Sequence, residues 1–275
     1  MKMLLKDGKQ KVLTLSYDDG FVHDIRLVNL LDKYGIKGTF NINSGMFTDE
    51  KEERKKFDGK LKLSESLVLY QKSGHEIGAH TVHHIRPDKV DKTELLCEIM
   101  EDRKALEEKF DTFVRGFAHP FSVYNDEIKE ILKLCGYSYA RGGESSYNFS
   151  LPENRYCIKP TCRHKDPRLF ELAESFVTEK PQDGDIYLFY LMGHSHEFDS
   201  EEKWDMMEKF CEKVAKKADV WYATNIELFD YIDAYNALKT TADKKIIYNP
   251  SVIDVWIEEK GKAYKIPAGQ TVEVL

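Results

Sequence analysis

The stretch GAHTVHH holds three histidines within five positions: His80, His83 and His84. His80 and His84 are four residues apart, and on a helical turn this spacing places both imidazoles on one face, where they can bind the same metal ion. A polar turn with surface histidines is the alternative interpretation of this stretch. A catalytic metal site also needs a third protein ligand and an open coordination position.

A second stretch, LSYDDG, offers that third ligand. Asp18 and Asp19 follow an apolar, β-branched run and precede a glycine, as expected where a strand ends in a turn. One carboxylate and two imidazoles form a suitable ligand set for zinc or another divalent transition metal. Taken alone, DDG is more typical of a simple turn or a helix N-cap, so the metal hypothesis depends on both stretches together.

Two other predicted strand ends carry residues of interest. The very apolar run YLFYLMG leads to His194 and His196, and a histidine at this position is suited to acid–base chemistry. The alternative is a buried core histidine with satisfied hydrogen bonds. In GFAHPFS, Pro120 and Phe121 predict a rigid turn with a backbone N–H that faces the same edge of the sheet.

Strands and helices alternate along most of the chain, because short β-branched or aromatic runs are followed by apolar residues at helical spacing. Strands are predicted at 11–17, 37–43, 75–80, 114–120, 137–143, 185–194 and 219–225. Helices are predicted at 22–35, 64–74, 91–110, 125–136, 167–180, 201–217 and 226–239, with an irregular stretch at 144–166. Parallel strands need crossover helices, so this α/β pattern predicts a parallel sheet that is either closed into a barrel or open and doubly wound. In a barrel, the strand ends described above meet at one edge.

The pattern changes near residue 243. Residues 243–275 contain short alternating runs separated by EKGK and PAGQ turns. We therefore predict a catalytic α/β domain at residues 1–242 and a small antiparallel β appendage at residues 243–275.

Composition argues against several classes of protein. The net charge of −7, without a basic run interleaved with aromatic residues, argues against a nucleic-acid partner and suits a neutral or cationic ligand. No apolar stretch approaches the roughly 18 residues of a membrane span. The N-terminal stretch lacks a secretory pattern and the five cysteines include no CxxC, which predicts a cytoplasmic protein with free thiols. The sequence does not indicate an oligomeric state.

These motifs together resemble those of polysaccharide deacetylases of the NodB-homology group, carbohydrate esterase family 4. LSYDDG resembles the family's TFDDG motif, HTVHH its H-[S/T]-x-x-H motif and LMGH its late leucine–histidine motif. The resemblance covers roughly residues 10–235. It implies a distorted (β/α)7-type barrel and a metal-dependent hydrolase that removes N- or O-linked acetyl groups from a carbohydrate. Zinc is the expected metal, with cobalt, nickel or manganese as alternatives.

The resemblance also implies a role for each motif residue. Asp18 would be the general base, which accepts a proton from a metal-bound water, and His194 the general acid. Asp19, His80 and His84 would hold the metal.

Other matched positions are expected to assist. The family's Pro-Tyr pair corresponds to Pro120 and Phe121, with the Phe121 N–H binding the oxyanion. Ala118 stands where the family has the arginine that orients the base, and Arg141 is the predicted substitute, with Arg115 as the alternative.

Further motif residues have smaller or open roles. Thr81 would brace the loop, whereas His83 would not bind the metal. His196 lies two residues after His194, so the choice between them as the general acid stays open. No carboxylate that would hold the acid histidine is evident in the sequence.

Two other functions fit part of the pattern. A related amidohydrolase that cleaves a small non-sugar amide or ureide would use the same residues, and like the deacetylase it would act on carbon–nitrogen bonds other than peptide bonds. A carbohydrate-binding relative without turnover would explain the altered arginine motif. A glycosidase that uses Asp18 and Asp19 is disfavoured, because paired glycosidase carboxylates lie about 5–9.5 Å apart across the scissile bond.

Overall fold

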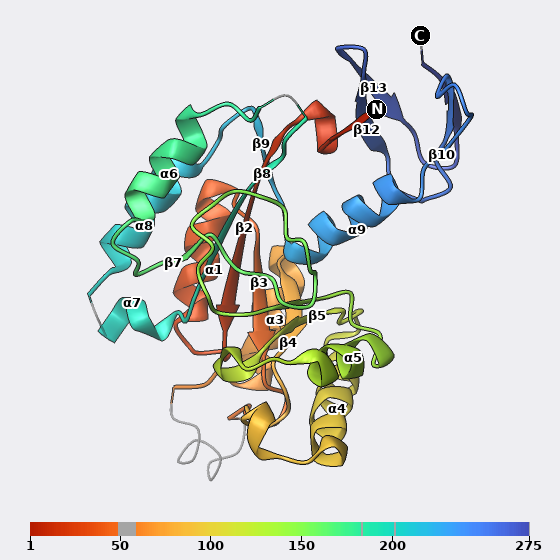
Figure 1. Cartoon of the computed structure of the whole chain (residues 1–275). Coiled ribbons are helices and arrows are strands. Elements are labelled where there is room, and N and C mark those ends of the chain that lie inside the picture. Colours follow the sequence, from red (N-terminus) through yellow and green to blue (C-terminus); the bar gives the residue numbers. More distant parts are fainter. Residues whose placement is uncertain (49–58, 183, 201, 275) are drawn as a thin grey trace.

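Eight parallel strands form the central sheet of the molecule, which curls into a barrel (Figure 1). The computed structural model describes residues 1–48, 59–182, 184–200 and 202–274. Seven strands pair in the order β6-β5-β4-β3-β2-β8-β7, and β9 pairs with the first part of β2. Their bounds are β2 Lys11–Asp18, β3 Gly38–Ile42, β4 Glu76–Ala79, β5 Gly116–Ala118, β6 Tyr139–Arg141, β7 Cys162–Arg163, β8 Tyr187–Gly193 and β9 Val220–Tyr222.

The barrel is distorted where its two outer strands approach each other. In the described part of the chain β6 and β7 form no ladder, and a single parallel bridge joins Arg141 to Ile158 instead. The segment around Ile158 then leads into β7.

Helices cover the outside of the barrel. Successive contacts join α6, α8, α1, α3 and α4 in a row. The bounds are α1 Asp24–Tyr34, α3 Leu63–Ser73, α4 Lys92–Phe110, α5 Asp126–Leu134, α6 Leu169–Thr178, α7 His196–Ser200 and α8 Trp204–Val214. Local sequence sets some of these ends. Gly35 ends α1 with a φ of 67°, which glycine adopts without strain, and the Asp91 side chain caps α4 by accepting hydrogen bonds from Thr93 and Glu94 N–H.

Side chains alternate between two faces along β2. Leu13, Leu15 and Tyr17 belong to the apolar core between the barrel and the helices. The residues between them are polar and hydrogen-bond across the barrel interior: Thr14, Ser16 and Asp18. This separation brings polar groups to the interior without exposing the apolar core.

The strand register extends the polar row across the sheet. Asp18 pairs with Asn41 of β3, and Asn41 pairs with Gly78 of β4. A Cβ at Gly78 would lie 2.3 Å from Asn41 Oδ1, so any other residue there would displace the Asn41 side chain. His80 follows two residues later on the same face. The interior positions of three adjacent strands therefore lead to the carboxyl edge of the barrel.

Two small antiparallel sheets, β1-β12-β13 and β10-β11-β14, lie beyond the amino-terminal edge of the barrel. Both chain ends belong to this part of the molecule, because β1 pairs with β12 (Figure 1). Helix α9, Asn225–Asn236, contacts both β2 and β12. The remaining bounds are β1 Lys2–Leu4, β10 Lys239–Thr240, β11 Ile246–Tyr248, β12 Val255–Glu259, β13 Lys262–Ile266 and β14 Thr271–Glu273, with 3-10 turns at Lys6–Gly8, Pro87–Lys89 and Pro120–Ser122.

The predicted α/β barrel with small antiparallel sheets is confirmed, and four short elements differ from the prediction. Strand β7 lies within the stretch predicted to be irregular, and β1, β10 and α7 were not predicted. The boundary at residue 243 remains a prediction, and β1, near the N-terminus, pairs with β12. The five cysteines are free thiols in the structure. None of the helices described is both long and apolar enough to cross a membrane.

Candidate active site

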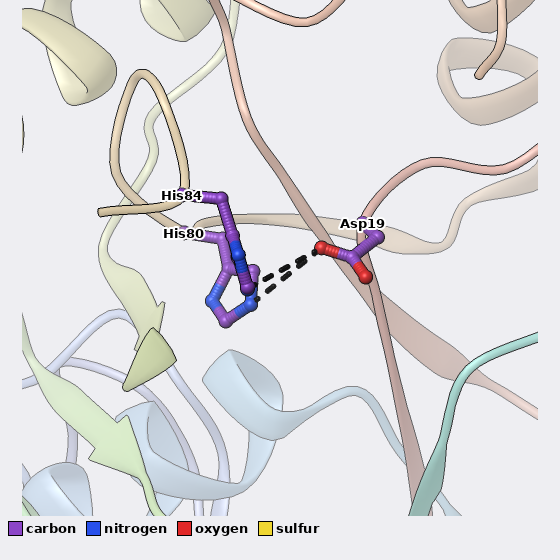
Figure 2. Close-up of side chains that lie close together, drawn as sticks. All are labelled: Asp19, His80 and His84. Atoms are coloured by element: carbon purple, nitrogen blue, oxygen red, sulfur yellow. Dashed lines mark ion pairs between the residues drawn. The ribbon is translucent and has the colours of Figure 1, made fainter. Parts of the chain in front are cut away.

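Asp19, His80 and His84 come together at the carboxyl edge of the barrel. Figure 2 shows both imidazoles side by side and directed toward the Asp19 carboxylate. Asp19 Oδ1 lies 3.9 Å from His80 Nε2 and 3.6 Å from His84 Nε2. One donor atom from each residue lies within 4.8 Å of the other two. The three side chains are therefore directed at one point in space.

The loop that carries the histidines is not helical. Thr81 and His84 adopt left-handed φ values of 65° and 53°, so the prediction of a helical turn is wrong. The two imidazoles converge because the chain reverses after β4. Thr81 Oγ1 accepts a hydrogen bond from Ile85 N–H at 3.3 Å, within this turn. His83 points away, with its Nδ1 2.6 Å from Glu98 Oε1.

Buried polar groups fix the orientation of His80. Its Nδ1 lies 2.8 Å from the Ala118 carbonyl, which as an acceptor requires the proton on Nδ1 and leaves Nε2 as a lone-pair donor toward Asp19. The backbone N–H of His80 donates to Asp102, and its carbonyl accepts from the Asn43 side chain. The ring orientation is thus set before any ion binds.

The arrangement fits a divalent transition metal. Two ligands about 2.1 Å from a tetrahedral zinc lie about 3.4 Å apart, close to the 3.6 and 3.9 Å between Asp19 and the two imidazoles. Burial lowers the pKa of His84 to about 4, and burial also lowers that of His80. Burial acts in the opposite sense on Asp19, but the charges of the adjacent histidines and Lys60 outweigh it and lower its pKa. At neutral pH the set therefore offers two neutral imidazoles and one carboxylate.

Asp18, next to the candidate ligands, is held by an arginine. The Arg141 guanidinium forms an ion pair with Asp18 Oδ1, which also accepts a hydrogen bond from the Asn41 side chain at 2.8 Å. Burial alone would raise the pKa of Asp18, but Arg141 and the nearby histidines hold it well below its usual range. Arg115 is not involved, because it forms a bidentate ion pair with Asp230.

His194 follows the end of β8, which pairs directly with β2, and faces the two carboxylates from there. Its Nε2 lies 4.0 Å from Asp18 Oδ2 and 3.8 Å from Asp19 Oδ2. On the other side of the ring, Nδ1 lies 3.7 Å from Glu197 Oε2 and 3.4 Å from the Arg163 guanidinium. Burial lowers the pKa of His194, but the interaction with Glu197 and the charges of Asp18 and Asp19 outweigh it and raise the pKa above its usual value.

The other predicted residues lie at the edge of this cluster. Phe121 is 55% exposed, adopts a φ of 55° and packs its ring against His84 with 4.6 Å between centroids. Pro120 is buried beside it. His196 packs against Phe21 with ring centroids 4.2 Å apart.

Several groups in contact with the site were not predicted from the sequence. Glu197 follows His194 by three residues and interacts with both His194 and His164. Lys60 Nζ donates to the Asp19 carbonyl at 2.6 Å and lies 3.6 Å from Asp19 Oδ1. Glu197 lies three residues after His194, so their spacing in the sequence already indicates a contact between them. No pattern in the sequence indicates the contact of Lys60 with Asp19.

Comparison with known proteins agrees with this site and fold. Residues 5–140 match the sequence profile of the polysaccharide deacetylase family. The chain belongs to this family. No curated protein matches it significantly by sequence.

Solved structures with TM-scores above 0.5 show the same fold at low sequence identity. A polysaccharide deacetylase described as putative, from Mycobacterium smegmatis, aligns with a TM-score of 0.60 and 15% identity, covering 86% of this chain and 94% of that one. The Xyl-CE4 domain of a multidomain xylanase from the hindgut metagenome of Trinervitermes trinervoides aligns with a TM-score of 0.55 and 16% identity, covering 82% and 92%. The Streptococcus pyogenes deacetylase PplD aligns with a TM-score of 0.44 and 19% identity over 53% of this chain and 64% of that one, which is less than two thirds of its length.

Proposed function

We propose that this protein is a metal-dependent deacetylase that hydrolyses acetyl groups from a carbohydrate. The observation that carries the proposal is the convergence of Asp19, His80 and His84 on one point, beside a second carboxylate, Asp18, and a third histidine, His194. Membership of the polysaccharide deacetylase family supports the same conclusion.

Asp19, His80 and His84 would hold the ion, for which zinc is our first candidate. A divalent ion at this position supplies a Lewis acid that polarises the acetyl carbonyl and lowers the pKa of water. Because Asp18 Oδ1 is occupied by Arg141 and Asn41, Asp18 Oδ2 is the oxygen that accepts the proton of the attacking water. The Arg141 charge keeps Asp18 ionised but makes it a weaker base, so proton transfer depends on an acidified water.

His194 would protonate the leaving group. An amine or alkoxide leaves poorly unless it is protonated as the bond breaks, and the raised pKa of His194 favours the proton-carrying form near neutrality. Glu197 orients the His194 ring from its Nδ1 side. It would be the carboxylate that holds the acid histidine, for which the sequence alone gives no candidate. The backbone N–H of Phe121 would donate to the developing oxyanion, a contact that is worth about 100-fold in rate in other enzymes.

A substrate screen with metal removal tests the proposed function. We expect a panel of acetylated oligosaccharides to release acetate, and a chelator to abolish the release. Added zinc or cobalt should restore it, with an unchanged circular dichroism spectrum throughout. Undiminished release in the metal-free protein would overturn the proposal, and amine release from small amides alone would favour the amidohydrolase.

Comparison of two neighbouring histidines tests the assignment of the acid. We expect His194→Ala to lower kcat by about 100-fold or more, the usual contribution of a general acid. His196→Ala, the matched control, should change kcat by less than about threefold, because its ring packs against Phe21. Initial rates with one acetylated oligosaccharide measure both effects, and equal rates in the two variants would contradict the choice of His194.

A further inference from the structure

One buried histidine beside the candidate active site has no part in the mechanism proposed above. His164 directly follows β7, and its side chain is 1% exposed. Its ring stacks on Tyr17, with 5.7 Å between centroids and 9° between planes, and packs against Phe198 at 4.2 Å. Its backbone N–H donates to the Met192 carbonyl of β8. The ring therefore has a fixed place between the barrel and α7.

Gly193 makes room for this ring. A Cβ at position 193 would lie 1.9 Å from His164 Nδ1, so any other residue there would displace the ring. Gly193 also immediately precedes His194, the proposed acid. The backbone that presents the acid thus accommodates His164 next to it.

Glu197 connects the two histidines. Its Oε2 lies 3.2 Å from His164 Nε2 and 3.7 Å from His194 Nδ1. Its other oxygen, Oε1, lies 2.6 Å from Lys165 Nζ and 3.6 Å from an Arg163 guanidinium nitrogen. The two cations therefore approach one oxygen of this carboxylate, and the two histidines approach the other.

The protonation states of both groups suit this contact. Burial lowers the pKa of His164, so its ring is neutral near pH 7. Burial acts in the opposite sense on Glu197, but its contacts with His164, His194 and Lys165 outweigh it and hold the pKa of Glu197 well below its usual range. A carboxylate only accepts hydrogen bonds, so the single ring proton of His164 belongs on Nε2. His164 Nε2 is buried, and the part of the chain that the structure describes offers it no other hydrogen-bond partner.

We propose that His164 is a positioning residue for the acid, which holds Glu197 Oε2 in place and through it orients the His194 ring. This role rests on the proposed deacetylase function and adds to it a buried residue that neither touches the substrate nor transfers a proton. Glu197 belongs to α7, which has only five residues and fixes the side chain weakly. Without His164, the carboxylate is free to rotate toward Lys165 and Arg163, and the acid loses its alignment with the leaving group.

Two substitutions separate the polar contact of His164 from its packing. His164→Phe keeps a flat ring against Tyr17 and Phe198 but removes the N–H that faces Glu197. With N-acetylchitotetraose as substrate, we expect it to lower kcat about tenfold or more with KM little changed, because a catalytic group misplaced by about 1 Å can cost about 100-fold in rate. His164→Gln places an amide N–H near the position of Nε2 and should restore most of the rate.

A double variant shows whether His164 acts through His194. In a His194→Ala protein, His164→Phe should cause no further loss of kcat, since residues that act as a unit are not additive. The substrate 4-nitrophenyl acetate gives a second readout, because its leaving group departs without protonation. Wild type and His164→Phe should hydrolyse it at equal rates, whereas a merely structural role would lower the rate in both backgrounds and with both substrates.

His75→Phe is the matched control. His75 is also buried, packs against Phe40 with 5.5 Å between ring centroids, and has its Nε2 3.3 Å from a carboxylate oxygen of Asp32. It precedes β4, however, and so lies at the amino-terminal edge of the barrel. A folded His75→Phe protein should therefore hydrolyse both substrates at the wild-type rate.

The outcomes distinguish this role from the proposed function. An unchanged kcat in His164→Phe, or an equal loss with and without His194, would overturn the role of His164. If the wild-type protein does not hydrolyse N-acetylchitotetraose, the proposed function fails for this substrate. Crystal structures of wild type and both His164 variants then still decide the positioning, since they give the distance from Glu197 Oε2 to His194 Nδ1 without turnover. We expect His164→Gln to keep this distance and His164→Phe to change it by about 1 Å, and the same distance in all three would contradict the proposal.

Discussion

Replacement of Asp18 by asparagine is expected to lower kcat by about 10²–10⁴-fold while the protein still binds one metal ion. Asparagine keeps the shape of the side chain but cannot accept the proton of the attacking water. Asp18 is not among the three residues directed at the candidate metal position. Steady-state rates with an acetylated oligosaccharide, together with metal content by mass spectrometry, measure the two effects separately.

A second variant controls for the partner of Asp18. Asp18→Asn leaves the buried Arg141 without its counter-charge, which can cost about 3–5 kcal/mol of folding free energy. The double variant Asp18→Asn/Arg141→Gln removes both charges and should be folded, bind metal and be inactive. An Asp18→Asn protein with wild-type kcat would show that another group is the base.

The second large effect concerns the metal itself. We expect His80→Ala to weaken zinc binding by more than about 100-fold, the upper range for loss of an outer partner of a ligand. Alanine removes one of three protein donor atoms, and Ala118 then loses its hydrogen bond to the ring. Titration calorimetry of the metal-free protein with zinc gives the affinity without reference to activity.

The same motif supplies the control. His83 is 59% exposed at its side chain and pairs with Glu98 on the protein surface. His83→Ala should therefore bind zinc with wild-type affinity, whereas His84→Ala should behave like His80→Ala. Equal affinities for the His80 and His83 variants would remove His80 from the ligand set.

The convergence of the candidate ligands could be predicted from the sequence, and the local conformation could not. Asp19 and His80 each follow a strand that ends at the same edge of a parallel sheet, so topology alone brings them together. Arg141 could be predicted for the same reason, since it ends another strand of the same sheet, β6. The prediction of a helical turn from His80 to His84 was wrong, because no sequence pattern indicates left-handed φ values at two non-glycine residues.

The residues that were missed depend on structure that local patterns do not encode. Strand β7 has only two residues, so Arg163 lay inside a stretch predicted to be irregular. Lys60 reaches Asp19 because residues far apart in the sequence pair across the bridge between Phe21 and Lys60. The contact of Glu197 with His194 could be predicted from their spacing of one helical turn, but α7 has too few residues to be predicted from the sequence.

Anomalous X-ray diffraction from a crystal soaked with zinc, recorded on both sides of the zinc absorption edge, tests directly whether the three side chains share one metal ion. We expect one strong anomalous peak with Asp19, His80 and His84 as ligands at about 2.0–2.2 Å. A map without a peak between these three side chains would contradict a shared metal site, provided that the zinc concentration used restores activity or leaves it unchanged.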